Sequence, residues 1–324
     1  MEPLLAEADV WEIMVNGPSS IFVKRRSGRG GFHDHIGRDR QIVESELAMT
    51  TAQDDDPEVG GWIDAAGIKT NYHDVGAGKP VILLHGSGPG VTAWANWRLN
   101  IGPISEHFRV IAPDLVGFGL TERPSDIRYS LDTWVAHLNG LMDSLGLEKA
   151  SLVGNSFGGA LALATAVRRP ERVDRLVLMG SAGVSFELTA GLDAVWGFEP
   201  SLENMRRLLD LFAYDRSLVS DELAEMRLRA ATLPGVQEAF ASMFPAPRQR
   251  WVDALASDES KISKLGHKTL IVHGREDRVV PLASSLRLFE LIGDSELHVF
   301  GRCGHWTQIE HRDRFNTLVA DFLA

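Results

Sequence analysis

The stretch that most constrains this fold is residues 152–159, Leu-Val-Gly-Asn-Ser-Phe-Gly-Gly. An apolar strand ends there in a Gly-x-Ser-x-Gly turn, and a helical run of alanine and leucine follows at 160–166. This strand–turn–helix order is typical of a nucleophile elbow, in which a serine hydroxyl is exposed at the tip of a sharp turn. Gly154 and Gly158 flank Ser156 and let strand and helix approach closely. A chain with 31 glycines can place an ordinary loop serine in this spacing, but the context favours Ser156 as a nucleophile.

The composition is that of an ordinary globular protein, since 44% of the 324 residues are hydrophobic and 24% are charged. A net charge of −11, spread along the chain, argues against nucleic acids and anionic membranes as partners. Cys303 is the single cysteine, so no internal disulfide can form and a reducing compartment fits. The first residues lack the basic start of a signal peptide, and no apolar run reaches the roughly 20 residues that span a bilayer. We therefore expect a cytoplasmic protein.

Residues 1–56 do not show the sustained periodicity of a packed domain. His33 and His35 lack further ligands at metal-site spacing, so a solvated loop is favoured over a metal site. We predict that 1–56 is an N-terminal extension. We further hypothesise that Met49 is the natural start and that residues 1–48 are disordered or misassigned. The intact mass of protein from the native host tests this hypothesis, and a full-length mass would contradict it.

From Trp62 onward, apolar strands alternate with helices. Several strands are apolar throughout, as is typical of strands covered on both faces. The pattern predicts an α/β fold with a mainly parallel sheet flanked by helices. Besides the strand before the elbow, the expected strands are 68–73, 81–84, 110–113, 173–179, 269–273 and 296–300, and the expected helices are 131–145, 160–166, 284–291 and one that ends at 324.

The alternation stops between residues 185 and 264, where apolar and aromatic side chains follow helical periodicity. We predict a core formed by 57–184 and 265–324, with 185–264 inserted as a helical lid over an active site. The alternative is a helical subdomain that packs only for stability.

A serine hydroxyl needs an adjacent base to act as a nucleophile at neutral pH. After a nucleophile elbow, the acid and the histidine follow in that order, each at the end of a later strand. Asp277 and His305 stand in those places, so we assign His305 as the general base and Asp277 as the group that orients its imidazole. Glu276 is the alternative acid. His85 is a rival base, but its place before a glycine-rich loop favours a supporting role.

An oxyanion that develops during acyl transfer needs backbone N–H donors. One should come from Phe157, directly after the nucleophile, and the other from Ser87 in the loop after the strand at 81–84. Gly86 and Gly88 in that loop let its backbone approach a substrate. We interpret His273 as structural and Cys303 as a small buried neighbour of the histidine.

Six segments together resemble the meta-cleavage-product hydrolases, a family with the α/β-hydrolase fold. They are HGSGPGVTAWANW, GNSFGGALALA, MGSAGVSFELTAGLDAVWG, MFPAPRQRWVDALAS, HGREDRVVPL and LHVFGRCGHWTQIEH. The resemblance covers nearly all of 62–324, lid included, and is closest to the 2-hydroxymuconic-semialdehyde hydrolases. It implies hydrolysis of a carbon–carbon bond in 2-hydroxy-6-oxo-2,4-dienoates, the ring-fission products of catechols, in bacterial degradation of aromatic compounds.

The resemblance also assigns residues to the substrate. Arg227 is expected to hold the carboxylate, Asn96 and Asn155 to contact the dienoate, and Trp306 to lie beside the catalytic histidine. A loop turn for Asn96 and core packing for Trp306 are the alternatives. The residues expected to shape the acyl side of the pocket are Ala182, Leu192, Trp196, Val279 and Val280.

In the expected mechanism, His305 assists ketonisation of the dienol, and Ser156 then attacks the distal carbonyl to form an acyl-enzyme. The products would be 2-hydroxypenta-2,4-dienoate and a small acid, with no metal or organic cofactor implied. By resemblance the protein is a homo-oligomer of open subunit number. The sequence also does not decide whether the group on the acyl carbon is hydrogen, methyl or a larger alkyl group. A carboxylesterase on the same fold and a non-catalytic binding protein for small ligands are the alternative functions.

Overall fold

The computed structural model describes residues 10–15, 21–25, 34–35 and 56–324. The chain divides into two compact units, Met1–Asp56 and Pro57–Ala324. In the first, β1 (Val10–Val15), β2 (Ile21–Arg25) and β3 (Asp34–His35) form an antiparallel sheet in that order. The expected start at Met49 lies outside the described residues, and the hypothesis on 1–48 stays a prediction.

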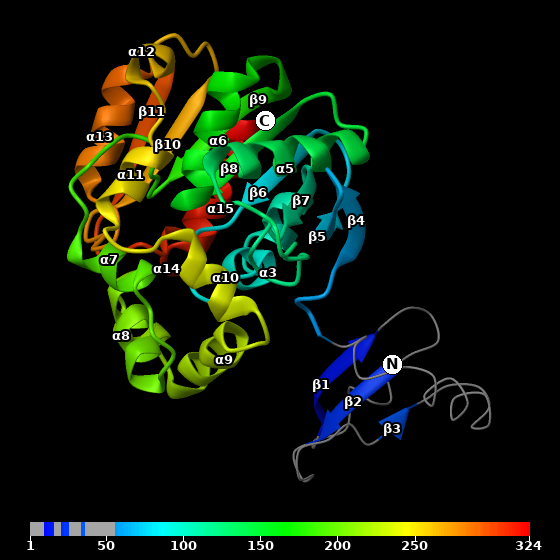
Figure 1. Ribbon diagram of the computed structural model, residues 1–324. Coiled ribbons are helices and arrows are strands. Elements are labelled where there is room, and N and C mark those ends of the chain that lie inside the picture. Colours follow the sequence, from blue (N-terminus) through cyan, green and yellow to red (C-terminus); the bar gives the residue numbers. More distant parts are fainter. Residues whose placement is uncertain (1–9, 16–20, 26–33, 36–55) are drawn as a thin grey trace. The chain divides into compact units, whose positions relative to one another are not determined.

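The second unit is built on an eight-stranded sheet with the order β11-β10-β9-β8-β6-β7-β5-β4 (Figure 1). All neighbouring strands pair in parallel, except that β5 runs antiparallel to both β4 and β7. The prediction of a mainly parallel sheet is therefore confirmed. The strands are β4 (Gly61–Ala65), β5 (Ile68–Val75), β6 (Pro80–Leu84), β7 (Arg109–Pro113), β8 (Ala150–Asn155), β9 (Val173–Met179), β10 (Thr269–Gly274) and β11 (Ser295–Phe300).

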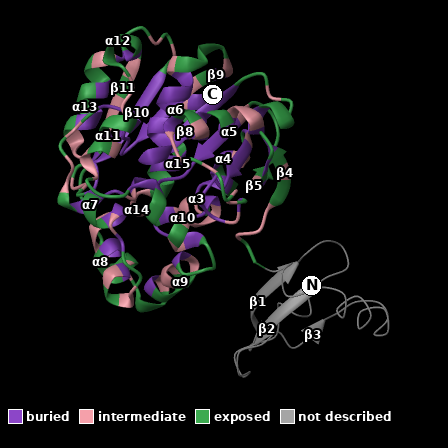
Figure 2. Ribbon diagram, in the orientation of Figure 1, coloured by how far each residue is buried: buried purple, intermediate pink, exposed green. Residues whose placement is uncertain are grey.

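Helices cover both faces of the sheet, and alternate strand residues enter two separate cores. In β6, Ile82 and Leu84 join the core under α5, α6 and α13, whereas Val81 and Leu83 join the core under α3, α4 and α15. β8 and β10 are buried throughout and β6 and β7 are buried after their first residue (Figure 2), which explains their continuous apolar sequence. The helices outside the inserted segment are α3 (Ala93–Trp97), α4 (Ile101–Ser105), α5 (Leu131–Ser144), α6 (Phe157–Arg168), η1 (Pro170–Arg172), α13 (Leu282–Leu291), α14 (Thr307–Glu310) and α15 (Arg312–Leu323).

The elbow joins β8 to α6 through Ser156, whose backbone has a φ of 54° and a ψ of −112°. A non-glycine residue with positive φ is strained and marks a constrained turn. A Cβ on Gly154 would lie 2.4 Å from the Gly158 carbonyl oxygen, and one on Gly158 would lie 2.2 Å from the Leu84 carbonyl oxygen. Glycine is therefore needed at both positions because strand and helix cross too closely for any side chain.

The segment between β9 and β10 is helical. Figure 1 shows α7, α8, α9 and α10 together at one end of the sheet, whereas α11 and α12 contact α6 on the core. The last part of the segment therefore belongs to the packing around the sheet. The elements are α7 (Ala190–Trp196), α8 (Leu202–Phe212), η2 (Arg216–Leu218), α9 (Asp221–Ala231), α10 (Val236–Met243), α11 (Gln249–Leu255) and α12 (Glu259–Ile262).

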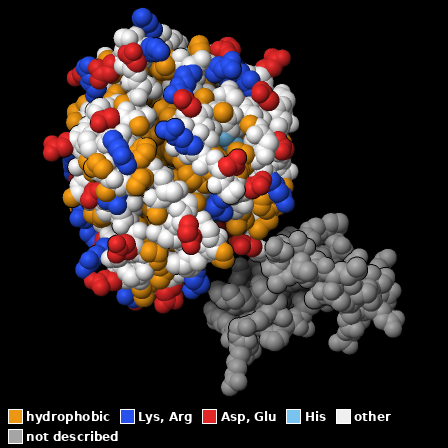
Figure 3. Space-filling model, in the orientation of Figure 1, with side chains coloured by type: hydrophobic (Ala, Val, Ile, Leu, Met, Phe, Trp, Pro, Cys, Tyr) orange, Lys and Arg blue, Asp and Glu red, His pale blue; other side chains and the backbone are white. Residues whose placement is uncertain are grey.

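On the face drawn in Figure 3, acidic and basic side chains are interspersed over the second unit. Such a surface does not present the single-sign field that attracts a polyanion. Of the helices in the described ranges, none combines the length and apolar character needed to cross a bilayer.

Candidate active site

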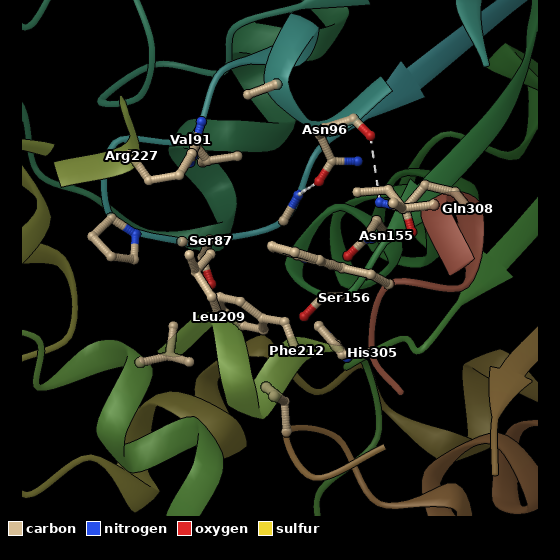
Figure 4. A pocket seen from close by; sticks show the side chains of 18 of the residues that line it. Ser87, Val91, Asn96, Asn155, Ser156, Leu209, Phe212, Arg227, His305 and Gln308 are labelled. Carbon is tan, nitrogen blue, oxygen red and sulfur yellow. Dashed lines mark hydrogen bonds between the residues drawn. The ribbon is translucent and has the colours of Figure 1, made fainter. Parts of the chain in front are cut away.

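A cavity of about 210 Å³ lies where the loops at the carboxyl ends of the strands meet the inserted helices. Ser156 and His305 both line it and come from loops far apart in sequence (Figure 4). In open α/β sheets, ligands bind outside the carboxyl ends of the strands. The remaining walls come from the loop after β6, from α3 and α14, and from α7, α8 and α9.

His305 and Asp277 form a short, buried hydrogen bond. His305 Nδ1 donates to Asp277 Oδ2 at 2.7 Å, which leaves Nε2 for the serine. Asp277 Oδ1 accepts from the backbone N–H groups of Val279 (2.7 Å) and Val280 (3.0 Å). Burial alone would raise the pKa of Asp277, but the interactions with His305, with His273 and with the Val279 N–H together outweigh it and hold that pKa below its ordinary value. Asp277 therefore stays ionised and fixes the tautomer of the imidazole.

Two further contacts position the imidazole of His305. Its ring stacks on Phe212 from α8, with centroids 5.9 Å apart, and its backbone N–H donates to the Phe212 carbonyl oxygen at 2.7 Å. A Cβ on Gly180 would lie 3.3 Å from His305 Nδ1 and from Asp277 Oδ2. The absence of a side chain there leaves room for the pair, and the contacts with Phe212 of α8 hold the histidine in place.

Glu276 does not face the imidazole. Its Oε2 accepts from the Cys303 backbone N–H at 2.9 Å, so this carboxylate holds the backbone of the histidine loop. Burial raises the pKa of the Cys303 thiol to about 12, which keeps it protonated and unreactive. His273 Nε2 donates to the Val280 carbonyl at 3.1 Å while its Nδ1 accepts from Ser285 at 2.7 Å. Burial lowers the pKa of His273, and this neutral side chain supports the acid loop.

His85 supports the glycine-rich loop, as expected. Its Nδ1 donates to the Gly86 carbonyl at 2.8 Å and its Nε2 accepts from the Leu115 N–H at 3.0 Å. Burial lowers its pKa to about 4, so it is neutral near pH 7. Gly90 has a φ of 63°, and a Cβ there would lie 2.4 Å from the backbone nitrogen of Ala231 in α9. Glycine at this position lets α9 pack directly on the loop.

Arg227 reaches the cavity from α9, and its Nη2 donates to the Gly90 carbonyl oxygen at 2.9 Å. Burial lowers its pKa from the usual range of arginine. The Glu58 carboxylate also interacts electrostatically with this guanidinium and raises its pKa, though less than burial lowers it. A guanidinium carries five N–H donors, so the bond to the Gly90 carbonyl does not use all of them. Arg98 also lines the cavity while its Nη1 donates to the Ala95 carbonyl at 2.7 Å. Arg98 was not among the residues expected at the site, because no motif in the sequence around it indicates that its side chain faces a cavity.

Three side-chain amides line the same cavity. Asn96 Nδ2, Asn155 Nδ2 and Gln308 Oε1 are buried and have no hydrogen-bond partner among the described residues. Unpaired buried polar atoms cost about 1–3 kcal/mol each, and such groups are expected where a ligand pairs them. Gln308 Nε2 donates to the Asn96 carbonyl (3.4 Å), and Asn96 Oδ1 accepts from the Gly86 N–H (3.4 Å), as Figure 4 shows. Nothing local in the sequence marks Gln308, whose partner is 212 residues away.

The lining residues that come from α7, α8 and η2 are apolar. Leu192 and Val279 line it as expected, whereas Ala182, Trp196 and Val280 are buried outside the residues that line it. Trp306 also lines it and stacks on Phe212 with centroids 5.2 Å apart. The lining residues that sequence analysis missed on this side are Val195, Met205, Leu209, Phe212, Leu218 and Leu223.

Gly86, Ser87 and Gly88 line the cavity, whereas Phe157, the first residue of α6, is buried and is not among the lining residues. Within the described part of the chain, no three histidine, cysteine or acidic side chains are grouped to hold a metal ion.

Comparisons with known proteins agree on one group. A family profile described as "alpha/beta hydrolase fold" matches residues 79–312. A 2-hydroxy-6-oxo-2,4-heptadienoate hydrolase from Pseudomonas putida is 67% identical over 82% of this chain and 97% of the relative. A 2-hydroxymuconate semialdehyde hydrolase from a Pseudomonas species is 63% identical over 84% of this chain and 96% of the relative. The crystal structure of a meta-cleavage product hydrolase from Pseudomonas fluorescens matches with a TM-score of 0.82 and 65% identity, over 83% of this chain and 98% of that one.

Proposed function

Because the chain belongs to the meta-cleavage-product hydrolases of the α/β-hydrolase fold, we propose that it hydrolyses a carbon–carbon bond in 2-hydroxy-6-oxo-2,4-dienoates during bacterial degradation of aromatic compounds. The substrates are 2-hydroxymuconic semialdehyde or its 6-alkyl homologues. Ser156 is the nucleophile, His305 the general base and then acid, and Asp277 the residue that orients the imidazole.

The polarity of the cavity carries this proposal. Arg227 and the unpaired amides of Asn96 and Asn155 supply donors for a carboxylate and its neighbouring oxygen. Aliphatic side chains such as Leu192 and Val279 face a small alkyl group or hydrogen. A simple esterase needs the triad but no buried cation, so the guanidinium favours a substrate with a carboxylate at one end.

The first step is ketonisation. The 2-hydroxyl loses its proton, the conjugated double bonds shift, and C5 gains a proton to give a 2,6-diketone, with His305 assisting the transfer. Arg227 binds the carboxylate and stabilises negative charge that develops on the adjacent C2 oxygen. This step creates the electron sink that later accepts the leaving carbon.

In the second step Ser156 Oγ attacks C6 while His305 takes its proton. The backbone N–H groups of Phe157 and Ser87 stabilise the C6 oxyanion. The C5–C6 bond then breaks, and its electron pair moves into the chain toward the C2 carbonyl. Protonation from His305 completes 2-hydroxypenta-2,4-dienoate. Water, deprotonated by His305, hydrolyses the remaining acyl-enzyme to a carboxylic acid, which is formate when the substrate is the semialdehyde.

The test compares three substrates with the purified full-length protein: the semialdehyde, its methyl ketone homologue and p-nitrophenyl acetate. Loss of the yellow dienolate absorbance with matching release of acid is the expected result, and the two dienoate rates rank the acyl groups. Ester cleavage without dienoate loss would overturn the substrate class while leaving the nucleophile in place.

We also propose that the helices α7 to α10 of the expected 185–264 segment act as the lid, that the protein is cytoplasmic and that it is a homo-oligomer. The edge strand β11, with its exposed Val299, and the exposed Leu286 and Phe289 of α13, which contacts β11, support self-association, because exposed apolar surface is enriched at interfaces. Light scattering should give a multiple of the monomer mass, reduced in Phe289→Glu. A monomeric wild type at micromolar concentration would refute this.

A further inference from the structure

Trp196 joins the lid to the glycine-rich loop of the site. Its indole Nε1 donates to Ser87 Oγ at 3.0 Å, across 109 residues of sequence. Trp196 is the last residue of α7, and both side chains are buried, with exposed fractions of 4% and 6%. Because Trp196 does not line the cavity, this hydrogen bond is its most direct contact with a residue that does.

The same indole belongs to an aromatic cluster that reaches the other side of the oxyanion site. Trp196 stacks nearly parallel on Phe244, with centroids 4.4 Å apart and ring planes 11° apart. Phe244 meets the Phe157 ring edge-to-face at 6.3 Å, and Trp134 packs on Phe157 at 4.6 Å. The two residues assigned as oxyanion donors are thus both attached to the lid, Ser87 by a hydrogen bond and Phe157 by ring packing.

The Trp196 bond adds an anchor at the Ser87 side chain. Glycines at 86, 88 and 90 make the backbone of this loop permissive. His85 and Arg227 hold the carbonyls of Gly86 and Gly90, and the indole holds the Ser87 side chain between them. Fixing the Ser87 side chain restricts the orientation of its own peptide N–H. An oxyanion donor acts only when it is already aimed at the position where charge develops.

We propose that Trp196 is a positioning residue for the oxyanion site. Its indole N–H holds Ser87, and thereby orients the Ser87 backbone N–H, only while α7 is docked on the core. This inference rests on the acyl-enzyme mechanism proposed above. The lid then does more than cover the substrate. When α7 moves away from the core, the Ser87 N–H is no longer held toward the oxyanion, and acylation stops.

The test uses Trp196→Phe, Ser87→Ala and the double variant. Phenylalanine keeps a ring against Phe244 and removes only the N–H donor, and alanine keeps the Ser87 backbone N–H and removes only the acceptor. Trp251→Phe is the matched control, because Trp251 Nε1 donates at 2.7 Å to the Pro245 carbonyl, away from the cavity. Stopped-flow single turnovers separate ketonisation from cleavage of the C5–C6 bond.

Each single variant should slow cleavage about tenfold, less than the loss of a whole oxyanion donor. The double variant should be no slower than either single one, and ketonisation, KM and the control should change less than about twofold. The proposal would be overturned if the losses in cleavage rate multiply in the double variant, if ketonisation slows as much as cleavage, or if the cleavage rate does not change in the single variants. If Trp196→Phe does not unfold cooperatively, the cleavage rate of Ser87→Ala compared with that of the wild type still tests the proposal.

Acylation by p-nitrophenyl acetate gives a second readout. It uses the same oxyanion site, so it should fall by the same factor in Trp196→Phe. A wild type that cleaves the ester but not the dienoate would refute the proposed function, and the ester rates of the variants would still test the role of Trp196.

Discussion

Replacing Arg227 by glutamine should separate dienoate hydrolysis from ester hydrolysis. Glutamine is shorter and gives up the bond to the Gly90 carbonyl, which now accepts from Arg227 at 2.9 Å, but the packing of the Ala231 backbone of α9 against Gly90 does not involve this side chain and should survive. The substitution removes the charge that would pair with the carboxylate.

The expected loss follows from the kind of bond removed. A hydrogen bond to a charged group contributes about 1.5–3 kcal/mol, which corresponds to about 10- to 100-fold in kcat/KM for the dienoate. p-Nitrophenyl acetate has no carboxylate, so its kcat/KM should change by less than about threefold. Ketonisation should slow along with substrate binding because Arg227 also stabilises charge near C2.

Arg229→Gln is the matched control on the same helix. The Arg229 side chain is 71% exposed and pairs with Glu225 at 3.9 Å, an interaction that contributes little. The assay is the initial rate of dienolate absorbance loss against the rate of nitrophenolate release for each variant. Equal losses for the dienoate and the ester in Arg227→Gln would refute the carboxylate assignment.

Three further predictions concern the fold and the acid loop. Gly158→Ala should destabilise the protein by about 3 kcal/mol in urea unfolding, because its Cβ would lie 2.2 Å from the Leu84 carbonyl oxygen. Gly102→Ala is the control, because a Cβ there meets open space, and equal urea midpoints for the two variants would contradict this prediction. Asp277→Asn should lower kcat about 10³- to 10⁴-fold and Glu276→Gln less than about tenfold, measured with the dienoate; the reverse order would exchange their roles. Burial lowers the pKa of His137 from 6.5 to about 4, so the stability contributed by its neutral form is present above pH 6.5 and lost as pH falls toward 4. Between pH 7 and 5 the wild type should lose about 2 kcal/mol more unfolding free energy than His137→Gln, and parallel pH profiles would contradict this.

The elbow could be predicted because its causes are local. The need for Gly154 comes from the crossing of β8 and α6, which follow each other in the sequence, whereas the need for Gly158 comes from Leu84 in β6, which only the fold brings near. Asp277 and His305 could be assigned because both follow recognisable strands of one parallel sheet, and the structure brings their side chains within 2.7 Å. Their catalytic roles stay predictions that the experiments above test.

The residues that the lid supplies could not be derived in the same way. Arg227 was selected only by resemblance, because neighbouring arginines on a helix look alike until the face against the core is known. Trp196 was expected to line the pocket, but the direction of its indole depends on how α7 packs, and it reaches Ser87 instead. Gln308 was missed because its role depends on Asn96, which only the fold brings near.

The most direct test of the account is a single turnover of 2-hydroxymuconic semialdehyde by Ser156→Ala, followed by absorbance and by quantitation of formate. We predict that the variant binds the dienolate with a dissociation constant close to the wild-type KM and still changes its spectrum through ketonisation. It should release formate at least about 10³-fold more slowly than the wild type. Formate release within about tenfold of the wild-type rate would contradict the role of Ser156 as the nucleophile.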